Sequence, residues 1–164
     1  PSSLYTPIYF MVGLRSEAQA FFLSCMVVVM CCLAATSLGY FFGSVVKSID
    51  MGLMLMSVVI LPLMVGGGFF INSSSIPIYF VWLKYVSFFK YGFENLMIIE
   101  WSDKKIDCDS DDGCYLENGN DVLKFYNIDK KNFKQNCYIL VLFCMFFRLL
   151  TYYILKYRER RLYG

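Results

Sequence analysis

Three apolar stretches dominate the sequence, and each is long enough to cross a lipid bilayer as a helix. No charged residue occurs in residues 18–46 or 51–71, and residues 137–155 contain one, Arg148. About 20 predominantly apolar residues suffice for a helix to cross the roughly 30 Å of hydrocarbon in a bilayer. The pattern therefore predicts three membrane-spanning helices at residues 18–46, 51–71 and 137–155.

The first two predicted spans are joined by a short polar turn at residues 47–50, which predicts an antiparallel helical hairpin. Small residues gather between Cys31 and Gly39 of the first span, where they favour close approach of another helix. The second span contains Pro62 and the glycines at 66–68. These residues indicate either a bent or unwound outer end or a close helix contact, and both readings stay open.

Residues 78–101 are rich in aromatic side chains, but Lys84, Lys90 and Glu94 interrupt the apolar runs at short intervals. A helix that crossed the bilayer here would place these charges in hydrocarbon. The segment is therefore expected to lie in the interface or to enter the membrane and return, with its aromatic rings at the level of the headgroups.

Residues 102–136 are polar and contain no run long enough to cross, which predicts a water-exposed loop. Cys108 and Cys114 flank an acidic turn in this loop, and two cysteines in an extracellular polar loop predict a disulfide. Calcium binding is the alternative, but the acidic residues do not match the spacing of the calcium-binding loop of EF-hands. No metal site is predicted.

The orientation follows from basic residues near the last span. The tail, residues 156–164, carries Lys156, Arg158, Arg160 and Arg161. The lysines that precede the last span belong to a loop of more than about 60 residues, and basic residues in such long loops influence membrane orientation less than those in short segments. The tail is therefore expected to be cytoplasmic and residues 102–136 extracellular. Arg148 is read as a membrane anchor whose side chain extends toward the inner headgroups, and a functional charge near the midplane is the alternative.

Composition narrows the function. The chain is 58% hydrophobic and 19% aromatic, has a net charge of +2 and contains no histidine, which removes the commonest general base and metal ligand. It contains no phosphate-binding Gly-x-x-x-x-Gly-Lys-Ser/Thr loop and no nucleophile elbow. This chain is therefore expected not to be an enzyme by itself and not to bind nucleic acid. It begins at Pro1 without an initiator methionine, so we expect a fragment of a longer protein.

Several short strings resemble the C-terminal half of the transmembrane domain of ABCG (White) half-transporters, an ABC-2 type domain. They are GGFFIN at 67–72, SIP at 75–77, WLKYVS at 82–87, KYGFENL at 90–96 and EW at 100–101. The opening YFMVGL at 9–14 is similar to the family's outer loop between helices three and four. FRLLTY at 147–152 and KYR at 156–158 are similar to its sixth helix. The resemblance covers nearly the whole chain and is weakest around Cys108.

The resemblance implies an all-α membrane protein in which residues 1–164 supply helices four to six of a six-helix domain, with a re-entrant aromatic segment and an extracellular loop. It also implies an upstream ATPase domain that binds ATP and Mg²⁺, while this chain itself needs no cofactor. One half-transporter supplies one of two ATPase domains, so a homodimer or heterodimer is implied. By alignment, Ser57, Leu61 and Met64 would line the substrate cavity, and Phe69 and Phe70 would form the outer gate.

Together, pattern and resemblance predict the transmembrane part of an ATP-driven exporter of lipids, sterols or other hydrophobic or amphipathic small molecules. Its location would be the plasma membrane or an organelle membrane. The alternative is a polytopic membrane scaffold or receptor-like subunit that transports nothing.

Overall fold

The fold is all-helical in a computed structural model, which describes residues 2–14, 17–46, 48–67, 81–102 and 118–163. In chain order the elements are α1 (Ser2–Val12), α2 (Ala18–Val45), α3 (Ile49–Gly66), α4 (Val81–Val86), α5 (Phe88–Trp101), α6 (Gly119–Phe125), the 3-10 turn η2 (Lys130–Asn132) and α7 (Phe133–Tyr163).

Three of these helices are long and apolar enough to cross a membrane, namely α2, α3 and the helix that includes α7. Their 28, 18 and 31 residues correspond to lengths of about 42, 27 and 46 Å at 1.5 Å per residue. The prediction of three long apolar helices is confirmed. The last of them continues well beyond the apolar run at 137–155, because the polar residues on both sides are also helical.

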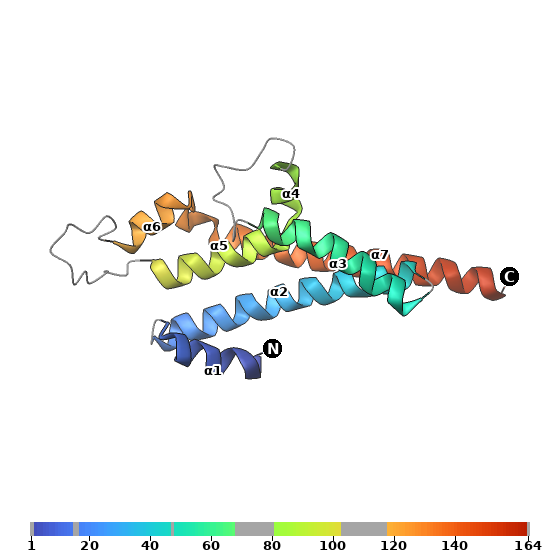
Figure 1. Cartoon of the computed structure of the whole chain (residues 1–164), viewed down its shortest axis with the longest axis horizontal. Coiled ribbons are helices and arrows are strands. Elements are labelled where there is room, and N and C mark those ends of the chain that lie inside the picture. Colours follow the sequence, from blue (N-terminus) through green and yellow to red (C-terminus); the bar gives the residue numbers. More distant parts are fainter. Residues whose placement is uncertain (1, 15–16, 47, 68–80, 103–117, 164) are drawn as a thin grey trace.

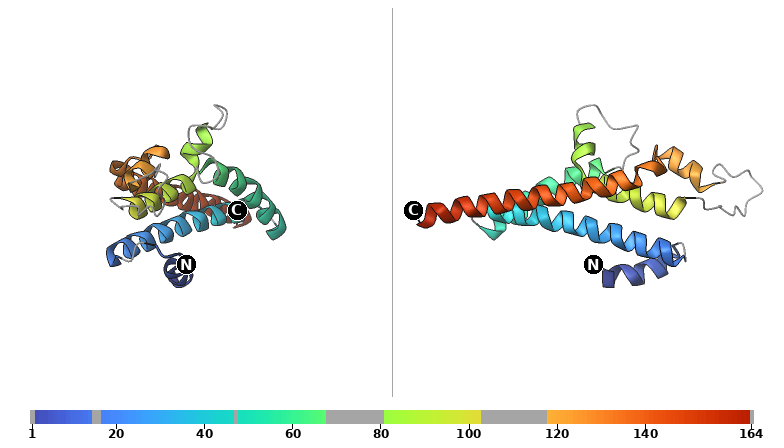
Figure 2. Two further views of the ribbon diagram at one scale, coloured as in Figure 1. Left: turned by 60° about the vertical axis from the view of Figure 1, so that its left-hand side comes forward. Right: turned by 180° about the vertical axis from the view of Figure 1, so that it is seen from behind.

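The helices α2, α3, α5 and α7 lie roughly along one common axis, and α4 stands across it (Figure 1). α2 and α7 run side by side in the same direction, and α3 and α5 run in the opposite direction, one after the other, against α2. The turn between α2 and α3 and the C-terminal end of α7 lie at one end of the molecule, and α6 and the start of α2 lie at the other (Figures 1 and 2). The predicted hairpin of the first two spans is therefore present.

The larger of two cores joins α2, α3, α4, α5 and α7. Its buried side chains are Ala34, Leu38, Leu63, Leu83, Phe88, Tyr91 and Leu140. Ala34 and Ser37, both from the stretch of small residues in α2, are fully buried. Small side chains at these positions let the neighbouring helices approach closely, as the sequence predicts.

The C-terminal end of α3 is held by the junction between α4 and α5. The helix continues through Pro62 and ends at Gly66. The carbonyl of Leu63, in the last turn, accepts a hydrogen bond of 2.6 Å from the hydroxyl of the buried Ser87, so a backbone group left over at a helix end is satisfied. A Cβ on Gly67 would lie 2.9 Å from Cβ of Phe89. At Gly66 and Gly67, therefore, the structure favours the close-contact reading of the glycines.

A second, small core lies at the end of the molecule that carries α6. Ile98, Leu123 and Ile128 are buried there, with Met97, Trp101, Tyr126 and Phe133 packed around them. The polar stretch 102–136 is thus not a loop throughout, because its residues 119–125 form a helix that covers the end of α5. Sequence reasoning missed α6, since a seven-residue helix with few apolar positions leaves little periodic signal.

Candidate substrate-facing site

One face of α3 exposes the residues that the resemblance assigns to the substrate cavity. Ser57, Leu61 and Met64 follow one another at intervals of four and three residues, which places them in one row along the helix. Ser57 is exposed, and Leu61 and Met64 are 64% and 36% exposed. The Ser57 hydroxyl donates to the carbonyl of Leu53 at 2.9 Å, so it is satisfied within the helix. The row is therefore a mainly apolar surface with one polar group.

At Met64 this row reaches a cavity of about 390 Å³ between α2, the end of α3 and α5. Side chains of α5 form much of the wall, and none of the lining residues is charged. The lining consists of Val28, Cys31, Cys32, Ala35, Met64, Phe88, Phe89, Gly92, Phe93 and Leu96. Ser57 and Leu61 do not line it, but they lie on the same helix face. The surface suits an apolar or weakly polar ligand.

The sequence analysis missed the contribution of α5 to this cavity. The signal available was Gly92, a glycine within an aromatic helix. A Cβ on Gly92 would collide with Sγ of Cys31 on α2. Because neither residue has a large side chain at this point, α5 lies directly on α2 and brings Phe88 and Phe89 to the cavity.

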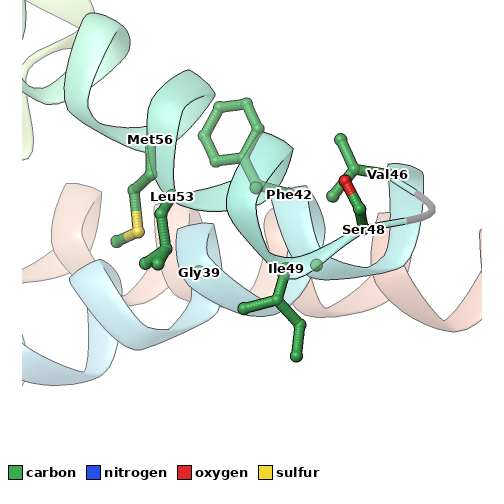
Figure 3. A pocket seen from close by; sticks show the side chains of 9 residues that line it. Gly39, Phe42, Val46, Ser48, Ile49, Leu53 and Met56 are labelled. Carbon is green, nitrogen blue, oxygen red and sulfur yellow. The ribbon is translucent and has the colours of Figure 1, made fainter.

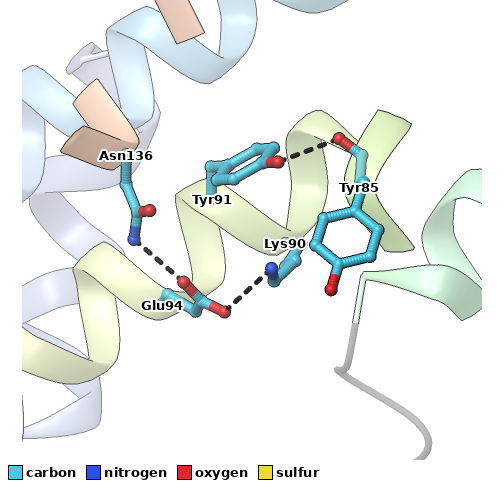
Figure 4. A network of polar contacts seen from close by, with 5 residues as sticks. All are labelled: Tyr85, Lys90, Tyr91, Glu94 and Asn136. Atoms are coloured by element: carbon cyan, nitrogen blue, oxygen red, sulfur yellow. Dashed lines mark hydrogen bonds and ion pairs between the residues drawn. The ribbon is translucent and has the colours of Figure 1, made fainter. Parts of the chain in front are cut away.

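Two charges of α5, Lys90 and Glu94, are held in a polar network on the side of that helix near α7 (Figure 4). Lys90 Nζ lies 3.6 Å from Glu94 Oε1, and the two side chains are only 14% and 17% exposed. Asn136 of α7, itself buried, donates from Nδ2 to Glu94 Oε2 at 2.9 Å. The two charges thus compensate each other inside the protein, which is how this segment accommodates them among apolar helices.

Two aromatic side chains complete the surroundings of Lys90. Its ammonium lies 5.1 Å from the ring centre of Tyr85 and 5.2 Å from that of Tyr91, within the range of cation–π attraction. The Tyr91 hydroxyl donates to the carbonyl of Tyr85 at 2.9 Å. Burial, and to a smaller extent the charge of Glu94, raise the pKa of Tyr91, so this hydroxyl stays protonated and remains a donor.

Asn95 links the same face of α5 to α7. It is completely buried and donates from Nδ2 to Sγ of Cys137 at 3.2 Å. Since Glu94 and Asn95 both contact α7, the wall of the cavity is fixed to the helix on its far side.

A second cavity, of about 260 Å³, lies at the turn between α2 and α3 (Figure 3). Apolar side chains such as Phe42, Leu53 and Met56 surround it, and Ser48 contributes its hydroxyl. That hydroxyl caps α3 by accepting from the backbone N–H of Met51 at 3.4 Å. The Ser48 hydroxyl is therefore engaged at the start of α3, and the other lining residues are glycines or apolar side chains.

Arg148 lies on α7 beside α2. Its Nε donates to the hydroxyl of Ser37 at 3.4 Å, which directs the side chain back along α7, away from the basic tail. The reading of Arg148 as an anchor to the inner headgroups stays a prediction.

Several other predicted residues lie outside the described residues, namely the gate pair Phe69 and Phe70 and the cysteines Cys108 and Cys114. The described cysteines, Cys25, Cys31, Cys32, Cys137 and Cys144, are free thiols. Within the described ranges no group of three or more His, Cys, Asp or Glu side chains could hold a metal ion.

Comparison with known proteins defines the class. Residues 3–101 match the family model described as ABC-2 type transporter. The chain is 35% identical over 162 residues to Protein white of Ceratitis capitata, covering 96% of this chain and 24% of that protein. It is 30% identical over 168 residues to ABC transporter G family member 1 of Dictyostelium discoideum, covering 98% and 21%. It is 34% identical over 101 residues to ABC transporter ATP-binding protein/permease wht-1 of Caenorhabditis elegans, covering 62% and 15%.

The three apolar helices and the matched domain make this chain part of an integral membrane transporter domain. It belongs to the ABC-2 type transporter family, in the group that contains White and the ABCG transporters. The chain spans about a quarter or less of the length of these relatives.

Proposed function

We propose that this chain forms the last three spanning helices of an ATP-driven exporter, and that the row Ser57, Leu61 and Met64 faces the transported molecule. The observation that carries the proposal is the row itself. Leu61 and Met64 are large apolar side chains left exposed on α3, and the row leads into an uncharged cavity. Exposed apolar surface of this kind inside a transporter domain suits a hydrophobic or amphipathic small molecule. Lipids and sterols are the proposed substrate class.

The energy source would lie outside this chain. The sequence contains no phosphate-binding loop, and one relative, wht-1, is called an ATP-binding protein/permease. We therefore propose that ATP and Mg²⁺ bind a separate domain of the same protein. Two copies, or this chain and a related one, would form a homodimer or heterodimer across the exposed side of α3.

The proposed orientation places the tail and the turn between α2 and α3 in the cytoplasm. These two segments lie at the same end of the helices, opposite α6 (Figure 1). α5 would then be the re-entrant segment. It begins beside Ala34, in the middle of α2, and runs toward the end of the molecule that carries α6. If the protein resides in the plasma membrane, an antibody should reach an epitope inserted at Asn118, before α6, on intact cells. Staining that requires permeabilised cells would show that the orientation is the reverse of the one proposed.

The test of the transport path is a pair of tryptophan variants in the reconstituted full-length protein. Leu61→Trp adds bulk to the row, and Leu55→Trp adds the same bulk about 120° around α3 from Leu61, at a residue that is 43% exposed. We expect Leu61→Trp to reduce ATP-dependent export of a fluorescent lipid at least tenfold and Leu55→Trp to leave it within about twofold. Equal export by both variants would remove the assignment.

A polytopic scaffold that transports nothing is the second candidate. Its supporting observation is the exposed apolar surface, which would also fit a protein partner. Parent protein that hydrolyses ATP but accumulates no lipid in vesicles would favour this alternative.

A further inference from the structure

The side chain of Arg148 has unused hydrogen-bonding capacity in an apolar part of the molecule. A guanidinium carries five N–H donors and stays charged. Here one donor, on Nε, contacts the neutral hydroxyl of Ser37 at 3.4 Å. Among the described residues, neither Nη atom has a hydrogen-bond acceptor and no carboxylate pairs with Arg148. A cation left in this state within an apolar helix is costly, so a further anionic partner would stabilise it.

A groove of about 430 Å³ lies directly beside this guanidinium, between α2 and α7. It is lined by Gly39, Gly43 and Ser44 of α2 and by Arg148, Thr151 and Leu155 of α7, with Tyr40 at its side. A Cβ added to Gly43 would meet nothing within 4 Å, and one added to Gly39 would touch only the side chain of Met56, at 3.7 Å. The two glycines therefore leave open a space on the tail side of Arg148, into which the guanidinium would turn from its contact with Ser37.

The hydroxyls of Ser44 and Thr151 in the groove can accept but are committed as donors. Ser44 donates to the carbonyl of Phe41 at 2.7 Å, and Thr151 donates to that of Phe147 at 2.8 Å. Arg148 is thus the group in the groove that can donate several hydrogen bonds to an anion. Arginine binds phosphate through two parallel N–H···O bonds, a geometry that its planar fork supplies.

The groove also leads toward the basic end of the molecule. It extends along α7 to Leu155, which directly precedes Lys156, and Arg158, Arg160 and Arg161 follow. These cations lie at the end of the molecule where α7 finishes (Figure 1), so they would concentrate anionic lipid at the mouth of the groove. The headgroup phosphate of such a lipid is the anion nearest to Arg148.

We propose that the groove between α2 and α7 binds an anionic phospholipid, with the guanidinium of Arg148 as the principal ligand of the headgroup phosphate. The bound lipid would contact both helices and hold them together at the tail end. This site is separate from the exposed row on α3, so the test of lipid binding is independent of the test of the proposed transport path.

The experiment is native mass spectrometry of the full-length protein in detergent, titrated with phosphatidylglycerol. The parent should retain a bound lipid, and Arg148→Gln should weaken its apparent affinity about tenfold or more, because a charge-assisted hydrogen-bonding group is lost. Gly43→Leu should weaken binding similarly, since it fills the groove while Arg148 remains. Arg158→Gln removes the same charge from the tail of the same helix and should change binding by no more than about threefold.

Four results would overturn the proposal. Equal losses in Arg148→Gln and Arg158→Gln would mean that lipid binds through general attraction to the tail. Unchanged binding in Gly43→Leu, or no lipid on the parent, would mean that the groove is not the site and that another segment of the protein covers it. Competition by inorganic phosphate at the same concentration as the lipid would indicate a free-anion site. If Arg148→Gln does not fold, Arg148→Lys decides, with intermediate weakening expected because the charge stays but the planar fork is lost.

Discussion

Asn136 of α7 donates a hydrogen bond of 2.9 Å to the carboxylate of Glu94 on α5, and both side chains are largely buried. The contact joins residues of two helices that are 42 positions apart in sequence. It fixes α5, which forms a wall of the candidate site, to the long helix α7.

Replacing Asn136 should therefore loosen α5. We expect Asn136→Ala to lower the free energy of unfolding by about 1–3 kcal/mol, because a largely buried carboxylate loses a donor. Asn136→Asp keeps the shape but places a second carboxylate beside Glu94, so its loss should be larger, and it should shrink as the pH falls and the new carboxyl binds a proton. Thermal unfolding of the detergent-solubilised protein measures both.

The control for this series is Lys124→Ala. It breaks a pair with Asp121 in which the lysine side chain is 79% exposed, so it should cost less than about 1 kcal/mol. If Asn136→Asp is as stable as the parent at neutral pH, the contact with Glu94 does not hold α5 in place.

Replacing Gly92 with any larger residue should destabilise the protein as long as Cys31 is present. Gly92→Ala puts a methyl group onto the Cys31 thiol, and overpacking of this kind costs about 1–3 kcal/mol. The double variant Gly92→Ala with Cys31→Ala should recover most of that loss. Gly43→Ala, whose added methyl meets open space, is the matched control and should cost nothing. An unchanged melting temperature in Gly92→Ala alone would show that the two helices are further apart.

The sequence predicts the long helices well because each is a continuous apolar run bounded by polar residues. It also predicts part of the packing face of α2, since Ala34 and Ser37, two of the small residues in the stretch 31–39, are fully buried. Ser57, Leu61 and Met64, the residues taken from the family resemblance, are exposed on α3. Their contact with a substrate stays a prediction.

The sequence could not predict where α5 lies, because its position depends on contacts between distant residues. Considered separately, Lys90 and Glu94 are charges that a membrane-spanning helix would place in hydrocarbon. In the structure they pair with each other and Glu94 also contacts Asn136, so their cost in an apolar setting falls. The end of α3 is similar, since its last turn is held by Ser87, 24 residues from Leu63.

Phe69 and Phe70 are predicted to form the outer gate by contact with the same pair on the partner subunit. Replacing both with Ala removes the bulk that closes the path, so ATP hydrolysis should continue while net export per ATP falls severalfold in the reconstituted full-length protein. Phe146→Ala, at a phenylalanine that is 58% exposed on α7, is the control and should leave the ratio unchanged. If the double variant only lowers the folding yield, the two rings anchor the protein at the lipid interface instead.

Cys108 and Cys114 are predicted to form an extracellular disulfide. Mass spectrometry of peptides from the unreduced protein should find the two cysteines linked, whereas Cys25 and Cys144, free thiols in the described part of the chain, should be alkylated after unfolding. Alkylation of both Cys108 and Cys114 without reduction would contradict the prediction.

The most direct measurement of the central claim is photo-crosslinking from α3. A benzophenone amino acid replaces Leu61, or in the control Leu55, in the full-length protein, which is then illuminated in lipid vesicles with a labelled transported lipid. The account predicts that the probe at Leu61 captures the labelled lipid, that excess unlabelled transported lipid suppresses the capture, and that the probe at Leu55 gives only capture that is insensitive to this competition. Equal and equally insensitive capture at both positions would show that both residues face bulk lipid, and would contradict the assignment of α3 to the transport path.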